Sequence, residues 1–73
     1  MINYYLNLNA QSNGDHEIHK ESCPYYYIYK NGNNFEYLGS YSNDYDALRH
    51  AKIKHPNLEI DGCAYCCSLI HKK

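Results

Sequence analysis

Two pairs of potential metal ligands constrain the fold of this chain more than any other feature of its sequence. His19 and Cys23 form a His-x3-Cys pair in the first half, and Cys63 and Cys66 form a Cys-x2-Cys pair far downstream. A Cys-x2-Cys turn lets two thiolates reach one tetrahedral ion, and zinc prefers cysteine and histidine ligands. The four residues therefore predict a closed, structural Zn site of the Cys3His type that joins the two halves of the chain.

The length of the chain makes such a staple plausible on physical grounds. With 73 residues there is room for one domain, which we expect to span residues 1–73. Hydrophobic residues make up 44% of the chain, but ten of them are tyrosines, whose hydroxyls need partners when buried. Domains below about 70–80 residues often rely on a metal, a disulfide or a partner subunit.

The cysteines have two other interpretations. Free thiols are often buried as small hydrophobic groups, so they could belong to the core alone. A disulfide from Cys23 to the cysteine tail would close a loop of about 40 residues and contribute roughly 4 kcal/mol. Structural zinc has an apparent binding energy of about 10–16 kcal/mol. Because a reducing cytosol also disfavours disulfides, we expect metal binding.

Two further residues near the C-terminus are alternative ligands. Cys67 directly follows Cys66, and His71 lies four residues after Cys67, a spacing that places both on one face of a helix. Each offers the site a second choice of ligand. The adjacent thiols of Cys66 and Cys67 also suit a thiol redox protein, which we keep as an alternative function.

The hydrophobic pattern predicts an α+β fold. Residues 2–9 alternate between apolar and polar faces, which indicates a strand that forms a hairpin with residues 16–19. The aromatic run 25–29 favours a strand, and residues 35–41 form the returning strand, in which Gly39 indicates a bend, a bulge or a close approach. A helix begins after a cap at Ser42 or Asn43 and ends near residue 55, before a proline. We therefore expect a small antiparallel sheet of three to five strands, one helix and a cysteine-rich C-terminal tail.

The tyrosine run predicts an interaction surface. Tyrosine is enriched at protein interfaces because its ring is large and its hydroxyl stays hydrated. If the run is a strand, its rings point to both faces of the hairpin, and one set remains at the surface. The residues that we expect in this surface are Tyr25, Tyr27, Tyr29 and Tyr37.

Charge and hydropathy exclude several other classes of function. The net charge is −1 and the basic residues are scattered, whereas nucleic-acid binding needs a clustered basic surface. The first nine residues have no basic segment followed by a long apolar run, so we expect no signal peptide or membrane span and a cytoplasmic location. No nucleophile, base and orienting group can be identified together, so we assign no catalytic residue and expect a protein that is not an enzyme.

The order of these motifs resembles a known family. His-x3-Cys, an aromatic segment, a short helix with alanines and Gly-Cys-x2-Cys, over residues 16–66, are similar to the small metal-binding domain of Ada-type DNA repair methyltransferases. The chain also resembles small uncharacterised bacterial proteins with Asn-Gly-Asp-His-Glu-x-His, here residues 13–19, and Asp-Gly-Cys-x2-Cys, here residues 61–66. The resemblance implies that the metal ligands are His19, Cys23, Cys63 and Cys66.

The sequence thus predicts a small zinc-stabilised module that binds an unknown protein partner or a second copy of itself. A nucleic-acid-associated domain like the family it resembles is the alternative. The methyl-transfer reaction of that family needs a basic surface to hold DNA. Because this chain has none, we carry over the fold and the metal site, and not the reaction.

Overall fold

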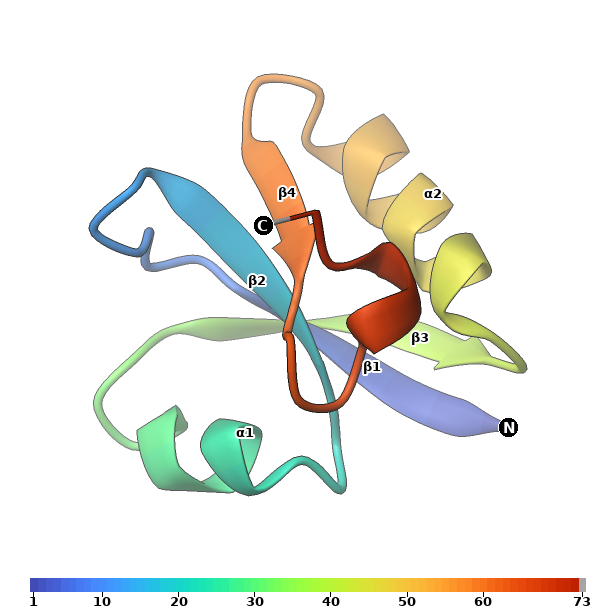
Figure 1. The fold of residues 1–73 in the computed structure, drawn as a ribbon, viewed down its shortest axis with the longest axis horizontal. Coiled ribbons are helices and arrows are strands. Elements are labelled where there is room, and N and C mark those ends of the chain that lie inside the picture. The colour runs from blue at the N-terminus through green and yellow to red at the C-terminus, as the bar shows by residue number, and fades with distance from the viewer. Residues whose placement is uncertain (73) are drawn as a thin grey trace.

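The computed structural model describes residues 1–72, which form one four-stranded sheet with a helix on each side (Figure 1). Neighbouring strands follow the order β3-β1-β2-β4. In chain order the elements are β1 (Ile2–Asn7), β2 (Asp15–Lys20), α1 (Pro24–Tyr29), β3 (Phe35–Tyr41), α2 (Asp44–Lys54), β4 (Glu59–Gly62) and the short 3-10 helix η1 (Ser68–Ile70).

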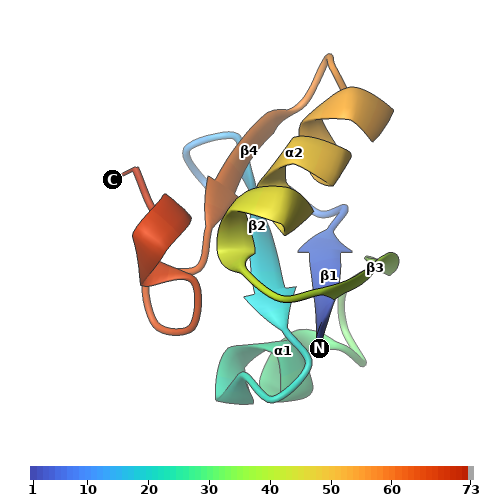
Figure 2. The same ribbon diagram turned by 90° about the vertical axis from the view of Figure 1, so that its right-hand side faces the viewer.

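The sheet is mixed. β1 pairs antiparallel with both β2 and β3, which confirms the predicted hairpin. β4 instead pairs parallel with β2, with Ile18 opposite Gly62. The reason is the connection through α2, because a crossover helix returns the chain in the direction of the strand it left. β3 and β2 both run antiparallel to β1, so a strand that repeats the direction of β3 lies parallel to β2 (Figure 2).

The apolar core lies between the sheet and α2. Alternate residues of β1, such as Tyr4 and Leu6, are fully buried there, as the period of two predicts. They pack against Ala47 and Ala51 of α2 and against Ile70 of η1. The cap at Asn43 is confirmed, because its side chain accepts a hydrogen bond from the Asp46 amide at 3.0 Å. The predicted helix therefore forms at the predicted place.

The prediction of a strand at residues 25–29 is wrong, because this segment is helix α1. Pro24 occupies the first helical turn, where its fixed φ is favourable, and Cys23 before it has the extended backbone of an N-cap. β3, the strand that was predicted to pair with the tyrosine run, pairs with one edge of β1 instead, and β2 pairs with the other edge. Tertiary pairing thus outweighs the preference of tyrosine for strands.

The second face of the sheet is covered by aromatic rings. Tyr5, which points away from the core, stacks on Tyr26 of α1 with ring centres 4.5 Å apart. Phe35 meets the Tyr26 ring edge-on at 5.0 Å, and the imidazole of His19 lies 5.8 Å from the Phe35 ring. These contacts hold α1 against the end of the sheet at which the candidate metal ligands lie.

Gly39 lies at an irregularity of β3, which is the bulge among the predicted alternatives. Its φ of +134° is strained for any other residue, and the register of β3 against β1 shifts between Tyr4 and Tyr5 at this point. None of the helices in residues 1–72 combines the length and the apolar character needed to cross a bilayer.

Candidate metal centre

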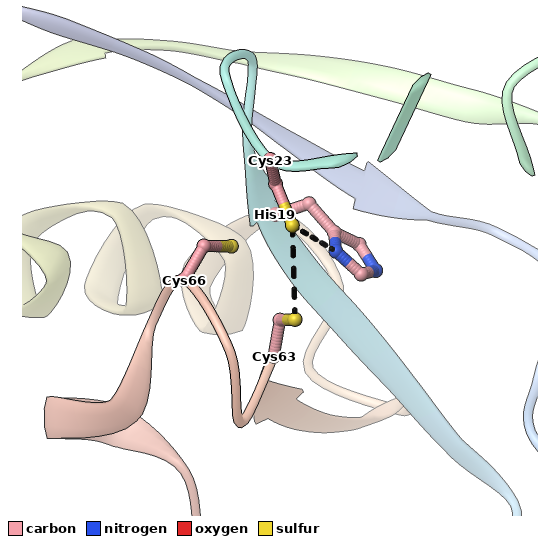
Figure 3. A group of neighbouring side chains, drawn as sticks. All are labelled: His19, Cys23, Cys63 and Cys66. Carbon is pink, nitrogen blue, oxygen red and sulfur yellow. Dashed lines mark hydrogen bonds between the residues drawn. The ribbon is translucent and has the colours of Figure 1, made fainter. Parts of the chain in front are cut away.

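Four predicted ligands meet at one end of the sheet. Each of the four residues His19, Cys23, Cys63 and Cys66 offers an atom that lies within 4.8 Å of the other three, so together they could hold a metal ion (Figure 3). The first three are buried, and Cys66 is partly buried. Thiol and imidazole groups from segments far apart in the sequence therefore converge.

Backbone hydrogen bonds place the four side chains. The Cys63 amide donates to the Ile18 carbonyl at 3.0 Å, which extends the parallel pairing of β4 and sets Cys63 beside His19. The Cys23 amide donates to the Lys20 carbonyl at 3.0 Å, so the chain turns back immediately after β2. The Lys20 amide in turn donates to Cys66 Sγ at 3.3 Å. This bond fixes Cys66 at the end of β2, where the other three candidate ligands also lie.

The two distances from Cys23 Sγ to neighbouring ligands match the edges of a tetrahedral site. Cys23 Sγ lies 3.9 Å from Cys63 Sγ and 3.7 Å from His19 Nδ1. With metal–sulfur bonds of about 2.3 Å and metal–nitrogen bonds of about 2.0 Å, the sulfur–sulfur edge of a tetrahedron is about 3.8 Å and the sulfur–nitrogen edge is about 3.5 Å. A disulfide needs sulfur atoms only about 2.05 Å apart. All four cysteines have free thiols in this structure.

Glu17 is a part of the site that the sequence analysis missed. Its Oε1 lies 3.3 Å from Nε2 of His19, which leaves Nδ1 directed at Cys23 (Figure 3). Metal-bound histidines commonly give their second ring nitrogen to a carboxylate, which fixes the ring. The signal was present in the sequence, because residues two apart on a strand share a face. Glu17 and His19 are such a pair in β2.

Burial and hydrogen bonding perturb the protonation of the cluster. Burial raises the pKa of Cys63 to about 12, and the hydrogen bond between Cys66 and Cys67, with burial, raises the pKa of Cys66. Burial lowers the pKa of His19, but hydrogen bonds to Cys66, Glu17 and Cys23 outweigh it and raise that pKa to about 10. Burial likewise opposes ionisation of Cys23, yet the bond to His19 leaves its pKa below the usual value. Two thiols therefore keep their protons unless a cation replaces them.

The alternative ligands lie outside this cluster. Cys67 is fully buried in the apolar core, with its Sγ 3.6 Å from Cys66 Sγ. The His71 side chain contacts β4 instead, since its Nδ1 lies 2.9 Å from the Gly62 carbonyl oxygen and 3.3 Å from the Asp61 carboxylate. It anchors the tail on β4. Neither belongs to the four-residue group that the described residues form.

Three of the four tyrosines of the expected surface lie on one element, and the fourth lies on another. Tyr25, Tyr27 and Tyr29 lie on α1 and are exposed, although on a helix and not on the predicted strand. Tyr37 lies on β3, where its ring packs on Tyr5 at 5.3 Å and its hydroxyl donates to Asn3. The sequence analysis missed Tyr65 of the tail, whose ring meets that of Tyr25 edge-on at 5.5 Å.

No family model, curated protein or solved structure matches this chain. The candidate site therefore rests on the geometry of its own residues.

Proposed function

We propose that this protein is a small zinc-stabilised module that binds another protein. The observation that carries the metal half of this proposal is the convergence of four ligand atoms within 4.8 Å of one another. Three thiolates and one imidazole fill all four positions of a tetrahedral ion and leave none for a substrate, which is the pattern of structural zinc. Thiolate-rich tetrahedral sites also select zinc over magnesium and calcium, which prefer oxygen ligands.

The metal would join the start of α1 to the loop between β4 and η1. His19 lies near the end of β2 and Cys23 directly precedes α1, whereas Cys63 and Cys66 belong to the loop between β4 and η1. Helix α1 has no buried residue, so apolar burial alone contributes little to holding it. An ion shared with the tail would fix the start of this helix. We therefore expect α1 and the tail to lose order when the metal is removed.

The binding half of the proposal rests on the exposed side chains of α1. Tyr27 is 68% exposed and Ile28 is 62% exposed, although both are large and apolar. Large aromatic side chains held at the surface of a short, stapled helix are typical of protein interfaces. The partner is another protein or a second copy of this chain.

The test begins with metal content per chain in protein purified under reducing conditions. We expect one zinc per chain and a loss of the α1 amide signals in NMR spectra after chelation. Cys23→Ser should abolish stoichiometric zinc, whereas Cys67→Ala, which removes a thiol just outside the cluster, should keep it. Metal-free protein whose unfolding is unaffected by chelator would overturn the metal site.

A partner screen tests the other half of the proposal. Sedimentation equilibrium of the zinc-loaded protein tests self-association, and Tyr27→Ala should weaken whichever complex forms without changing the unfolding temperature. The matched control is Tyr45→Ala, since Tyr45 is also exposed but lies on α2. Equal weakening by both changes would mean that α1 is not the binding surface.

Thiol redox exchange is a second candidate function, favoured by the 3.6 Å between Cys66 Sγ and Cys67 Sγ. Reactive thiols need a low pKa, however, and the Cys67 hydrogen bond and burial raise the pKa of Cys66. Exchange with a small disulfide faster than that of free cysteine would favour this candidate. Salt-dependent binding of DNA would favour the nucleic-acid alternative, which the net charge of −1 disfavours.

A further inference from the structure

A groove of about 540 Å³ runs between α1 and the tail, beside the candidate metal centre. Three tyrosine rings line it, from both sides: Tyr25 and Tyr29 of α1, and Tyr65 of the loop after β4. His19, Cys63 and Glu17 also line it. Its volume falls in the range of about 300–1,000 Å³ that is usual for ligand sites, and it exceeds what one side chain would fill.

The rings form a surface that is open to solvent. Tyr25 and Tyr29 are nearly parallel, with centres 6.4 Å apart, and Tyr65 stands edge-on to Tyr25. Tyr25 is 41% exposed and Tyr65 is 67% exposed. A ligand that enters the groove therefore meets aromatic faces on two sides, and such faces carry partial negative charge.

With zinc bound, His19 would be a neutral ligand, and the fixed charge of the groove would have one sign. Glu17 is the carboxylate among its lining residues, and no lysine or arginine of residues 1–72 lines it. Glu17 is held by His19 through Oε1 and also accepts a hydrogen bond from Gln11, but a carboxylate offers about four lone-pair sites. Zinc bound to three thiolates would add a formal charge of −1, since two positive charges meet three negative ones. An anionic ligand is thus repelled and a cation is attracted.

We propose that this groove binds an arginine side chain in a peptide segment of a partner protein. A guanidinium group is planar, so it can stack on a tyrosine face while it donates two parallel hydrogen bonds to a carboxylate. The rest of the groove is lined by amide side chains, including Asn9 and Asn33, which are suited to the peptide backbone on either side. The inference rests on the proposed function, because it identifies the partner as a protein.

The arginine preference over lysine follows from geometry. An ammonium group is compact and strongly hydrated, and it cannot stack or bond in a bidentate way. A lysine peptide should therefore bind more weakly than the arginine peptide. A peptide with citrulline, which has the same shape without the charge, should bind more weakly still.

The test uses the full chain loaded with zinc, with metal content measured on the same sample. Acetyl-Gly-Arg-Gly-amide is titrated into the ¹⁵N-labelled protein, and binding is followed by NMR shift changes. We expect the changes at Glu17, Tyr25 and Tyr65, and a citrulline peptide at least about tenfold weaker. Glu17→Gln, which can still accept from His19, should weaken arginine binding about tenfold. Tyr65→Ala should weaken it about two- to fivefold.

Tyr45→Ala is the matched control and should change nothing, because Tyr45 is an exposed tyrosine of α2 that does not line the groove. Equal binding of the citrulline peptide, tighter binding of the lysine peptide, or no binding at millimolar concentration would each overturn the inference. If the zinc-loaded, folded protein fails to bind, the groove proposal is wrong and the metal site stands. If the protein cannot be loaded with zinc but still binds the peptide, the zinc proposal is wrong and the groove proposal stands.

Discussion

Glu17 Oε1 lies 3.3 Å from His19 Nε2, while Nδ1 of the same ring lies 3.7 Å from Cys23 Sγ. One side of the imidazole is thus held by a carboxylate and the other faces the thiols. With a metal bound, this arrangement would favour the tautomer in which Nε2 carries the proton and Nδ1 faces the ion. We therefore expect Glu17 to act as a positioning residue and not as a ligand.

Removing this carboxylate should weaken metal binding. We expect Glu17→Ala to lower zinc affinity about 10–100-fold, as for other carboxylates behind metal-bound histidines, and Glu17→Gln to lower it less because an amide oxygen still accepts from Nε2. Competition with a chromogenic chelator measures both affinities. Equal affinity of the alanine variant and the parent would show that the contact does not orient the ring.

Zinc affinity should fall as the pH falls. The folded, metal-free site holds protons tightly, since the pKa of Cys63 is raised to about 12 by burial and that of His19 to about 10 by its hydrogen bonds. Both groups must lose their protons to bind a metal, so protons compete with zinc. We expect apparent affinity to drop by more than about tenfold per pH unit between pH 8 and pH 6. Chelator competition at three pH values tests this, and a flat profile would contradict a thiolate site.

Gly62 should resist substitution more strongly than other glycines. A Cβ at this position would lie 2.4 Å from Ile70 Cγ1 and 2.8 Å from the Cys67 carbonyl oxygen, so the tail could not dock. We expect Gly62→Ala to lower the free energy of unfolding by about 1–3 kcal/mol.

Gly32→Ala is the matched control for that change. A Cβ at Gly32 meets nothing within 4 Å, so we expect little effect. Urea unfolding of both zinc-loaded variants provides the comparison. Similar unfolding midpoints for the two variants would mean that η1 does not pack on β4 in solution.

Glu36 should make stability depend on pH in the acid range. The hydrogen bond from His55 lowers the pKa of this carboxyl below its ordinary value of 4.5, against the opposing effect of burial, and Lys54 adds to it. A lowered pKa gives stability that is complete above the ordinary value and is lost as pH falls through the folded value. We expect a contribution of at most about 1 kcal/mol, because the pair is partly exposed.

Glu36→Gln should therefore flatten the acid limb of the unfolding free energy, measured with denaturant from pH 6 to pH 3. Glu59→Gln, at an exposed carboxylate on β4, should leave that limb unchanged. An unchanged limb in the Glu36 variant would show that His55 and Lys54 do not hold this carboxylate in the folded state.

Much of this fold was predictable because its signals are local. The alternation of β1, the cap at Asn43 and the bulge at Gly39 each depend on a few neighbouring residues. The convergence of the predicted ligands was also accessible, since ligand type and spacing limit how a chain can meet a tetrahedral ion. The structure brings together the four residues that the pattern indicates.

The parts that could not be predicted depend on distant pairing. The sequence of residues 25–29 carries no information on the two strands that pair with β1. The preference of these residues for a strand was therefore misleading. The parallel pairing of β4 depends likewise on the path of α2 across the sheet. The contacts of Tyr65 with Tyr25 follow from that pairing, which is why the groove had no signal in the sequence.

The parallel alignment of β4 beside β2 also sets the order of events during folding. Cys63 reaches His19 only through the hydrogen bond that continues this pairing, and the two strands can meet only after β3 and α2 have closed the long loop between them. An early hairpin of β1 and β2 offers a metal just two ligands. We therefore expect tight metal capture to be a late step, so that a zinc-responsive probe in a refolding experiment would report when the native topology is complete.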